Sequence, residues 1–513
     1  MTVSAAKQFG HGRYLALAAS IAVLLPGCAG QVREETLQAA EEVRKGPEAP
    51  PFRSITNFSV ALRCMDNHMI TFGVRDVSVL VEDLADQTKK VNAGTRDMLI
   101  SAVSDMTKRS RAIRLVAYGQ DSGNLIGFLK EAERKNAYSV IPQYDIKGSI
   151  SQFDESVAKK DSSFGISFAE VFNYGRANVG NATILGIDLT VLNTEDLSVV
   201  PGVTSRNGVL IYKQGKGTDA DAQYHKFGIN FTTALSKAEG NSQALRNLVE
   251  LAVIELFGKL TKVPYWTCLG ADPKSEAVAN EMADWYYTMT GDAAELIAYF
   301  QYQLSIRGYY NGPVDGASNP QLAKAITDLK TALGLQPNAK INQELFASYL
   351  NADHARLQAD RARSPVAAPQ PADPIRLTIG AAKGAGKFKR GETIDLTVKA
   401  SRDAYVYCFL RDETKKIQRF FPNRFAKDAL VSASEPLQLP GKMRFQLAAS
   451  DKGIAETVAC FAAPKEVLTA LPDPLNAPDF EPMTGVSLEQ LKTAFARAAG
   501  GGMGEASYNI EVR

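Results

Sequence analysis

The sequence is short of the residues from which most catalytic and metal sites are built. It has 4 histidines and 2 tryptophans among 513 residues, and no two histidines stand at a metal-ligand spacing such as His-Glu-x-x-His. It also lacks a Cys-x-x-Cys pair, a phosphate-binding Walker loop and a Gly-x-Ser-x-Gly elbow. We therefore expect a protein that is not an enzyme, with no cofactor and no metal.

An excess of charge of one sign is also missing. The chain has 58 basic and 56 acidic residues and a net charge of +2. Nucleic-acid-binding domains are strongly basic on at least one face, so this balance argues against nucleic acid as a partner. The length predicts several domains.

The N-terminus has a few basic residues followed by an apolar run over 14–25. The run is shorter than the ~20 apolar residues of a membrane helix and is typical of a bacterial export signal. Residues 25–28, Leu-Pro-Gly-Cys, resemble a lipobox, which implies a signal peptide over 1–27 and lipidation of Cys28. Because Ala29 is not aspartate, the resemblance further implies an outer-membrane anchor. The alternative is an ordinary cleaved signal with a cysteine nearby.

Four of the five cysteines remain once Cys28 is set aside. Disulfides persist in an oxidising compartment, and four cysteines allow three pairings. Their positions favour two bridges, one within the N-terminal region and one within the C-terminal module, namely Cys64–Cys268 and Cys408–Cys460. The alternative is four buried free thiols, because cysteine is among the most buried residue types.

Changes in composition divide the chain into segments. Residues 28–51 are polar and end on prolines, as a tether does, and an Ala/Pro-rich stretch within 356–374 is typical of an interdomain linker. The expected order is signal peptide 1–27, tether 28–51, α/β domain 52–270, helical module 271–355, linker 356–374 and C-terminal β domain 375–513.

The α/β domain is predicted from strand and helix patterns that alternate along the chain. Two stretches, 148–182 and 203–236, alternate polar and apolar residues instead. Each predicts a hairpin with strands about ten residues long, the length of a tilted membrane strand. The candidate membrane-strand side chains are Phe164, Ile166, Phe168, Phe227, Ile229 and Phe231. The alternative is two soluble hairpins on a periplasmic sheet.

The order of these features resembles the curli secretion channel (CsgG-like) family over about residues 52–268. It includes "IKGSISQFD" before the first hairpin, the strand "LGIDLTVLNTEDLSVVPG", and a closing helix. The resemblance implies a homo-oligomeric ring whose subunits pool their hairpins into one outer-membrane β-barrel that exports secreted subunits. The family's constriction loop is aromatic, whereas "LVEDLADQTKKVNAGT" has no aromatic residue; Asn92 is the constriction candidate.

The helical module contains "YYNGPVDG" over 309–316, a turn between two helical patterns. This turn resembles the first repeat of a peptidoglycan-binding domain, a three-helix module. The resemblance implies contact with wall glycopeptide, with candidate residues Tyr309, Tyr310, Asn311 and Asp315. The second repeat departs from the family pattern, with Asn-Ala at 338–339 where Asp-Gly is usual, so a protein-protein adaptor is the alternative.

The C-terminal segment has alternating runs such as "TIDLTVKA" and "AYVYCFL" separated by turn residues, which predict an antiparallel β-sandwich-like domain. The order Arg-Gly-Glu, Tyr-Val-Tyr, Phe-Pro-Asn resembles a domain of unknown function found at the end of bacterial envelope proteins.

Together these segments predict an α+β multidomain chain. The expected function is an outer-membrane lipoprotein that forms an oligomeric secretion or surface-attachment channel for adhesin or fibre material and is held to the cell wall. Its expected partners are the outer membrane, peptidoglycan, further copies of itself, a secreted or surface protein and periplasmic accessory proteins. The alternative is a lipid-anchored periplasmic scaffold without a pore.

Overall fold

The computed structural model of the chain describes residues 52–54, 58–91, 93–117, 142–155, 182–213, 220–227, 229–235, 240–363, 373–381, 386–450 and 452–513. Residue contacts make Arg53–Arg513 one compact unit. Its architecture is mixed α and β with several sheets, as the sequence predicts at this coarse level.

The N-terminal α/β domain contains one large sheet and a layer of helices. Its elements are β1 (Phe52–Ser54), α2 (Ser59–Thr71), β2 (Val77–Val81), β3 (Ala85–Asp86), α3 (Thr95–Met106), β4 (Ile113–Ala117), β5 (Tyr144–Asp154), β6 (Ala182–Asn193), β7 (Val199–Lys213), β8 (Ala220–Lys226), β9 (Ile229–Leu235), α6 (Gly240–Thr261) and α7 (Tyr265–Cys268).

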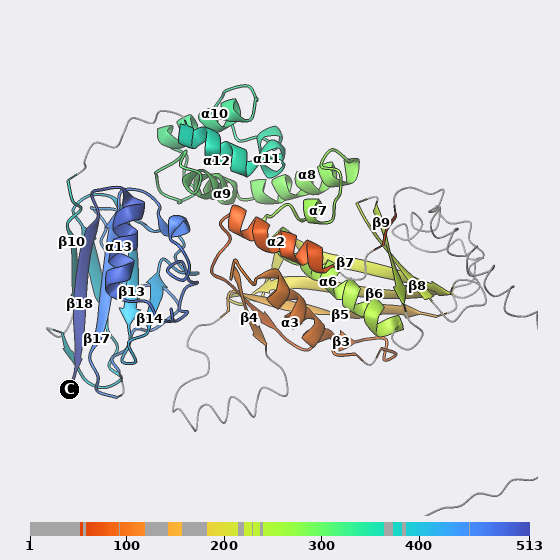
Figure 1. Cartoon of the computed structure of the whole chain (residues 1–513), viewed down its shortest axis with the longest axis horizontal. Coiled ribbons are helices and arrows are strands. Elements are labelled where there is room, and N and C mark those ends of the chain that lie inside the picture. The colour runs from red at the N-terminus through yellow and green to blue at the C-terminus, as the bar shows by residue number, and fades with distance from the viewer. Residues whose placement is uncertain are drawn as a thin grey trace, which may run out of the picture. The chain divides into compact units, whose positions relative to one another are not determined.

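Among the described residues this sheet has nine strands, in the order β1-β9-β8-β7-β6-β5-β2-β4, with β3 paired to β5. β2 is parallel to β4 and β5, whereas β5 to β9 are antiparallel to their successive neighbours. α3 and α6 pack on the sheet and α2 packs on both helices (Figure 1). The helices therefore cover one face and meet the sheet in a continuous apolar core.

Residues 251–258 of α6 are buried around the whole circumference of the helix. The four consecutive residues 251–254 point in different directions, and each is at most 1% exposed. A helix that is apolar all round belongs in a core. α6 meets this condition because β6 and β7 contact it on one side and α2 and α3 on the other.

The second predicted hairpin belongs to the domain's own sheet, where it occupies β7, β8 and β9. Phe231 is 2% exposed and packs edge-on against Phe58, with ring centroids 5.6 Å apart. Phe227 and Ile229 are half-buried against the same core. The sequence predicts that Phe231 faces lipid. In the structure it points into the core of the domain instead.

Two polar contacts hold the β8–β9 hairpin to α6. The Tyr224 hydroxyl donates to the carbonyl of Ala244 over 3.0 Å, and the Lys226 ammonium lies 2.6 Å from the buried Glu255 carboxylate. The hairpin is therefore a structural part of the α/β domain in this single chain.

Five candidate residues of the sequence analysis lie outside the described residues. These are Cys28, Asn92, Phe164, Ile166 and Phe168. In the part of the chain that the structure describes, no helix is both long and apolar enough to cross a membrane.

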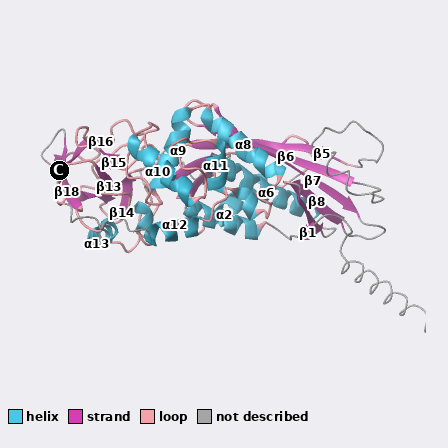
Figure 2. Cartoon of the chain, turned by 90° about the horizontal axis from the view of Figure 1, so that it is seen from above, coloured by secondary structure: helices cyan, strands magenta, loops and turns pink. Residues whose placement is uncertain are grey.

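The helical region follows directly, and its helices are α8 (Glu276–Thr290), α9 (Ala293–Ser305), α10 (Pro320–Ala332), α11 (Gln343–Leu350) and α12 (His354–Arg363) (Figure 2). α9, α10 and α11 are here called the three-helix module. The expected linker over 356–374 is helical over its first part, 356–363. The Asp353 side chain accepts the Arg356 N–H, and Leu357 is buried in the core, so α12 continues beyond the predicted boundary.

The C-terminal domain contains two sheets and one long helix. Its elements are β10 (Leu377–Ala381), β11 (Lys387–Phe388), β12 (Leu396–Ala400), β13 (Ala404–Arg411), β14 (Ile417–Phe421), β15 (Leu430–Val431), β16 (Leu437–Leu439), β17 (Glu456–Ala463), the 3₁₀ helix η1 (Leu468–Ala470), α13 (Leu488–Ala499) and β18 (Gly504–Val512).

The two sheets have the orders β10-β12-β16 and β11-β18-β17-β13-β14, with β15 beside β13. One apolar cluster fills the space between them, as in a sandwich. A second cluster joins the outer face of the larger sheet to α13, where Phe495 stacks on Phe461 with centroids 5.1 Å apart. Because both faces of β13 are covered, residues 404–409 are all buried. The domain also departs from a purely antiparallel fold, since β11 is parallel to β18.

Candidate functional site

Side-chain caps define where the helices of the three-helix module begin. Asp292, Asn319 and Asn342 precede α9, α10 and α11, and the side-chain oxygen of each accepts a backbone N–H of the first turn. Each cap satisfies a donor that the helix leaves unpaired and contributes about 1 kcal/mol. The caps thereby fix the residue at which each helix begins.

An apolar cavity of about 300 Å³ lies among α8, α9 and α10, and we call it the module groove. Thr290 and Ser318 contribute hydroxyl groups to its wall. The other lining residues are mostly aliphatic, namely Tyr286, Ala293, Leu296, Ile297, Leu322, Ala323, Ile326, Ala339 and Ile341. A lining that is apolar apart from a few polar groups is typical of small-ligand sites, and it suits methyl and acetyl groups better than charged ones.

The 309–316 turn contains the four wall-binding candidates, and the structure shows what two of them contact. The Tyr310 hydroxyl donates to the carbonyl of Pro313 and accepts from the amide of Asn319 over 2.8 Å. The Asp315 carboxylate accepts a hydrogen bond from Gln301 over 2.9 Å. A Cβ at position 312 would clash with the Tyr310 hydroxyl, which explains the glycine there. Tyr310 and Asp315 therefore hold the turn in shape.

The other two candidates are nearer to solvent. Tyr309 is half-buried under the guanidinium of Arg361, which lies 4.9 Å from the ring centroid. Asn311 is exposed. The four residues share one turn, but none of them lines the module groove. Their role in wall binding stays a prediction.

The C-terminal domain contacts this same turn. The Tyr405 hydroxyl donates to the carbonyl of Gly312 over 3.0 Å, and the Val314 N–H donates to the Asp428 carboxylate over 3.0 Å. Burial raises the pKa of Asp428. The turn is thus partly used as a contact between regions of the chain, which leaves the module groove as the more open feature.

The three-helix module also attaches to the end of α2. The backbone carbonyls of Thr71, Phe72 and Gly73 accept hydrogen bonds from side chains of the α9 segment, respectively from Arg307, Gln303 and Tyr302. A helix C-terminus leaves its last carbonyls unpaired, so these three contacts both satisfy α2 and fix the module beside the α/β domain.

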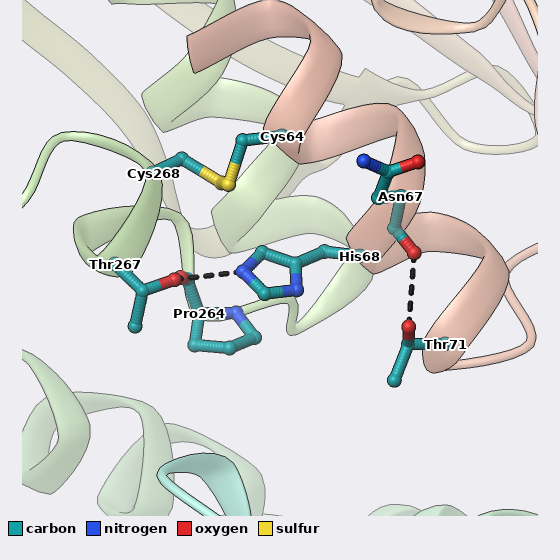
Figure 3. The surroundings of a disulfide bond; sticks show 7 residues. All are labelled: Cys64, Asn67, His68, Thr71, Pro264, Thr267 and Cys268. Atoms are coloured by element: carbon teal, nitrogen blue, oxygen red, sulfur yellow. Dashed lines mark hydrogen bonds between the residues drawn. A yellow bond between two sulfur atoms is a disulfide. The ribbon is translucent and has the colours of Figure 1, made fainter. Parts of the chain in front are cut away.

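Both disulfides favoured by the sequence are present, Cys64–Cys268 and Cys408–Cys460. Cys64 lies on α2 and Cys268 ends α7, so the first bridge joins the first helix of the domain to its last (Figure 3). The second links directly opposed residues of β13 and β17.

His68 lies one helical turn after Cys64, and its Nε2 is 2.7 Å from the Thr267 hydroxyl (Figure 3). Burial lowers the pKa of His68, which favours the neutral form of the ring. Among the described residues, Cys64, His68 and Cys268 place three atoms of metal-ligating type within 4.8 Å of one another. A metal would require the thiolates, and the disulfide occupies both sulfurs.

Comparison with known proteins identifies two segments. Residues 294–348 match the peptidoglycan-binding domain family. Residues 387–466 match the family described as Domain of unknown function (DUF4384). The first match covers nearly all of the three-helix module and most of the module groove, and the second covers much of the C-terminal β domain. No curated protein matches the chain significantly.

Two solved structures are distantly similar. PelC from Paraburkholderia phytofirmans, solved as a dodecamer, matches with a TM-score of 0.17 and 12% identity over 35% of this chain and 86% of that chain. A Xanthomonas campestris protein of the DUF330 family matches with a TM-score of 0.18 and 12% identity, over 38% of this chain and 86% of that chain. Similarity this low supports no functional argument, and the resemblance to the curli secretion channel family stays a prediction.

Sequence reasoning missed the groove residues. Leu322 and Ile326 stand four apart on α10, which is the spacing of an ordinary core face. Nothing in that pattern separates a core position from a groove position.

Proposed function

We propose that the protein is a bacterial envelope protein that binds peptidoglycan through its three-helix module and is lipid-anchored in the outer membrane through Cys28. The observation that carries this proposal is the module groove, which lies largely within the segment that matches the peptidoglycan-binding domain family. The lipid anchor rests on the lipobox resemblance alone. The proposal assigns the chain no catalytic step.

The chemistry of the groove supports wall contact. Cell-wall glycan offers N-acetyl groups and its peptides offer alanine methyl groups, both of which fit an aliphatic lining. The Thr290 and Ser318 hydroxyls can exchange hydrogen bonds with the amides that accompany these groups. Wall binding through such a groove is independent of net charge, which agrees with the balanced composition of the chain.

A paired substitution on α10 tests this proposal. Ala323 lines the groove, whereas Ala332 on the same helix is exposed and outside it. We expect Ala323→Phe to fill the groove and weaken co-sedimentation with purified peptidoglycan sacculi at least tenfold, and Ala332→Phe to leave it unchanged. Equal binding by both variants would remove the groove as the site. Failure of the unsubstituted protein to sediment would remove wall binding itself.

A second candidate function is an oligomeric export or surface-attachment channel. It is supported by the lengths of β5, β6 and β7, which have 11, 12 and 15 residues, against a mean strand length of about 5–6. Their outer face bears polar groups such as the Asp188 and Arg206 side chains, which are 51% and 85% exposed. A second copy could pack against such a face.

The channel candidate is tested by electron microscopy of the full-length protein extracted from outer membranes in mild detergent. Ring-shaped particles with a detergent belt, together with conductance across planar bilayers, would support it. Single copies would contradict it and leave a lipid-anchored scaffold that recruits secreted or accessory proteins.

A further inference from the structure

Two asparagines of the chain, Asn207 and Asn311, are followed directly by glycine. In this pair of residues the backbone nitrogen of the glycine can attack the side chain of the asparagine, because glycine has no Cβ to obstruct the approach. The reaction requires a side chain and a peptide group that are free to turn toward each other. The surroundings of the two asparagines therefore decide which of them reacts.

Asn207 is held firmly in β7. It is 8% exposed, and its side-chain amide donates to the Ser205 hydroxyl over 2.6 Å and to the Glu255 carboxylate over 2.7 Å. Gly208, the residue after it, lies opposite Gly186 of β6 in the sheet. Turning the Asn207 amide toward Gly208 would deprive the buried Glu255 carboxylate of a donor, which is unfavourable.

Asn311 has different surroundings. It lies outside the helices and strands, and it is exposed. Within the part of the chain that the structure describes, its side chain makes no hydrogen bond, and neither does the peptide group that joins it to Gly312. Rotation of this peptide group therefore breaks no hydrogen bond with a described residue. Exposed groups with few hydrogen bonds rearrange at a low cost in free energy.

We propose that Asn311 is a site of spontaneous deamidation. The Gly312 nitrogen attacks Cγ of Asn311, the bond from Cγ to Nδ2 breaks, and ammonia leaves with the proton that the attacking nitrogen gives up. Water then opens the cyclic imide at either of its carbonyls and produces aspartate or isoaspartate. Water is the only other reactant, and the net change replaces a neutral amide with a carboxylate.

The isoaspartate product changes the shape of the turn as well as its charge. Its main chain runs through the former side chain, so one carbon atom is added between residues 311 and 312. Gly312 is buried and packs against Tyr310, and its carbonyl accepts from the Tyr405 hydroxyl over 3.0 Å. The longer main chain displaces this carbonyl. The contact between the 309–316 turn and the C-terminal domain therefore loosens as the protein ages.

Ageing of the full-length protein in detergent tests the assignment. The protein is held at mildly alkaline pH, digested at acid pH and analysed by mass spectrometry. We expect the peptide that contains Asn311 to gain one mass unit at least tenfold faster than the peptide that contains Asn207. Equal rates, or a faster reaction at Asn207, would overturn the proposal.

A substitution at the exposed position locates the reaction. Asn311→Gln keeps an amide there but requires a larger ring, so its peptide should gain mass at least tenfold more slowly than that of the unsubstituted protein. A mass gain at the original rate would place the reaction at another residue and overturn the assignment. Neither result depends on wall binding by the module groove.

Hydrogen exchange tests the loosening of the turn. The Val314 N–H donates to the Asp428 carboxylate over 3.0 Å, and after ageing it should exchange at least tenfold faster in the isoaspartate form than in Asn311→Gln aged for the same time. Asn311→Asp introduces the charge without the additional carbon and is the matched control, so it should exchange like Asn311→Gln. Equal exchange in the isoaspartate form would contradict the loosening.

Discussion

The three-helix module and the C-terminal β domain contact the α/β domain through different kinds of interaction. The module shares an apolar core with the α/β domain, since a single buried cluster runs from Phe58 to Leu357. The C-terminal domain has two cores of its own, and ion pairs are prominent where it meets the α/β domain. There Asp76 accepts from both Arg419 and the Asp479 N–H, and the Asp479 carboxylate in turn accepts from Arg424.

This difference predicts how the stability of each region depends on its contact with the α/β domain. An apolar junction loses free energy in proportion to the surface exposed when it opens, so the three-helix module and the α/β domain should unfold together. A buried ion pair adds little net stability but is costly to break on one side only. The C-terminal domain should therefore remain folded when its junction is disrupted.

The largest effect is expected in the apolar core that the α/β domain shares with the helical region. Trp266 is fully buried and contacts Trp285 with centroids 5.0 Å apart. Trp266→Ala should lower the free energy of unfolding by about 4 kcal/mol, because it removes a large buried side chain and leaves a cavity. Urea unfolding followed by circular dichroism measures this. Hydrogen exchange should show α6 and α11 losing protection together. Loss of protection in only one of them would contradict the claim that the two regions unfold together.

Asp76→Asn tests the charged junction. The substitution keeps the shape of the side chain but leaves the Arg419 guanidinium without its buried counter-charge, which should cost about 3 kcal/mol. We expect faster hydrogen exchange at β2 and around 476–480, while the strands of the sandwich stay protected. Global unfolding of the C-terminal domain would show that its own two cores are not enough to keep it folded. Asp188→Asn, at an exposed position, is the control.

Acid should weaken the same junction. Burial tends to raise the pKa of Asp76, but Arg419 and Arg75 together with the Asp479 N–H hold it below the usual value. A carboxyl group with a lowered pKa stabilises the fold above its unfolded pKa of about 4 and loses that contribution as the pH falls. The stability advantage of the unsubstituted protein over Asp76→Asn should thus be full above pH ~5 and shrink below pH ~4. An advantage that is constant down to pH ~2 would contradict this.

The smallest difference expected is between the two disulfides. They are separated by 204 and 52 residues in the sequence. In the loop-entropy description the longer loop gives about 1 kcal/mol more stabilisation. Cys64→Ser with Cys268→Ser should therefore lower the free energy of unfolding about 1 kcal/mol more than Cys408→Ser with Cys460→Ser. Equal losses would mean that local packing, and not loop length, dominates.

Much of the fold could be predicted from the sequence, because it depends on local patterns. The alternation in "YVYCFL" predicts β13, and helical spacing over 95–106 predicts α3. The disulfide partners followed from their places in two separate regions. The position of Phe231 could not be predicted from the sequence. Strand alternation shows that one face is apolar, but it does not show whether helices or lipid cover that face.

The candidate sites and the contacts between domains were harder to predict, for a different reason. Arg419 and Asp76 are 343 positions apart, and each by itself is an ordinary charged residue. Their partnership depends on how two domains meet, which no local pattern contains. The wall-binding candidates on the 309–316 turn were located correctly on a turn, but the structure uses Tyr310 and Asp315 to shape it.

The hydrogen bonds from Arg307, Gln303 and Tyr302 to the end of α2 have a mechanical consequence. A wall strand that pulls on the module groove would load these hydrogen bonds and the shared apolar core at the same time. Both resist movement of the three-helix module along the axis of α2. Tension from the cell wall would thus pass directly from the three-helix module into the α/β domain.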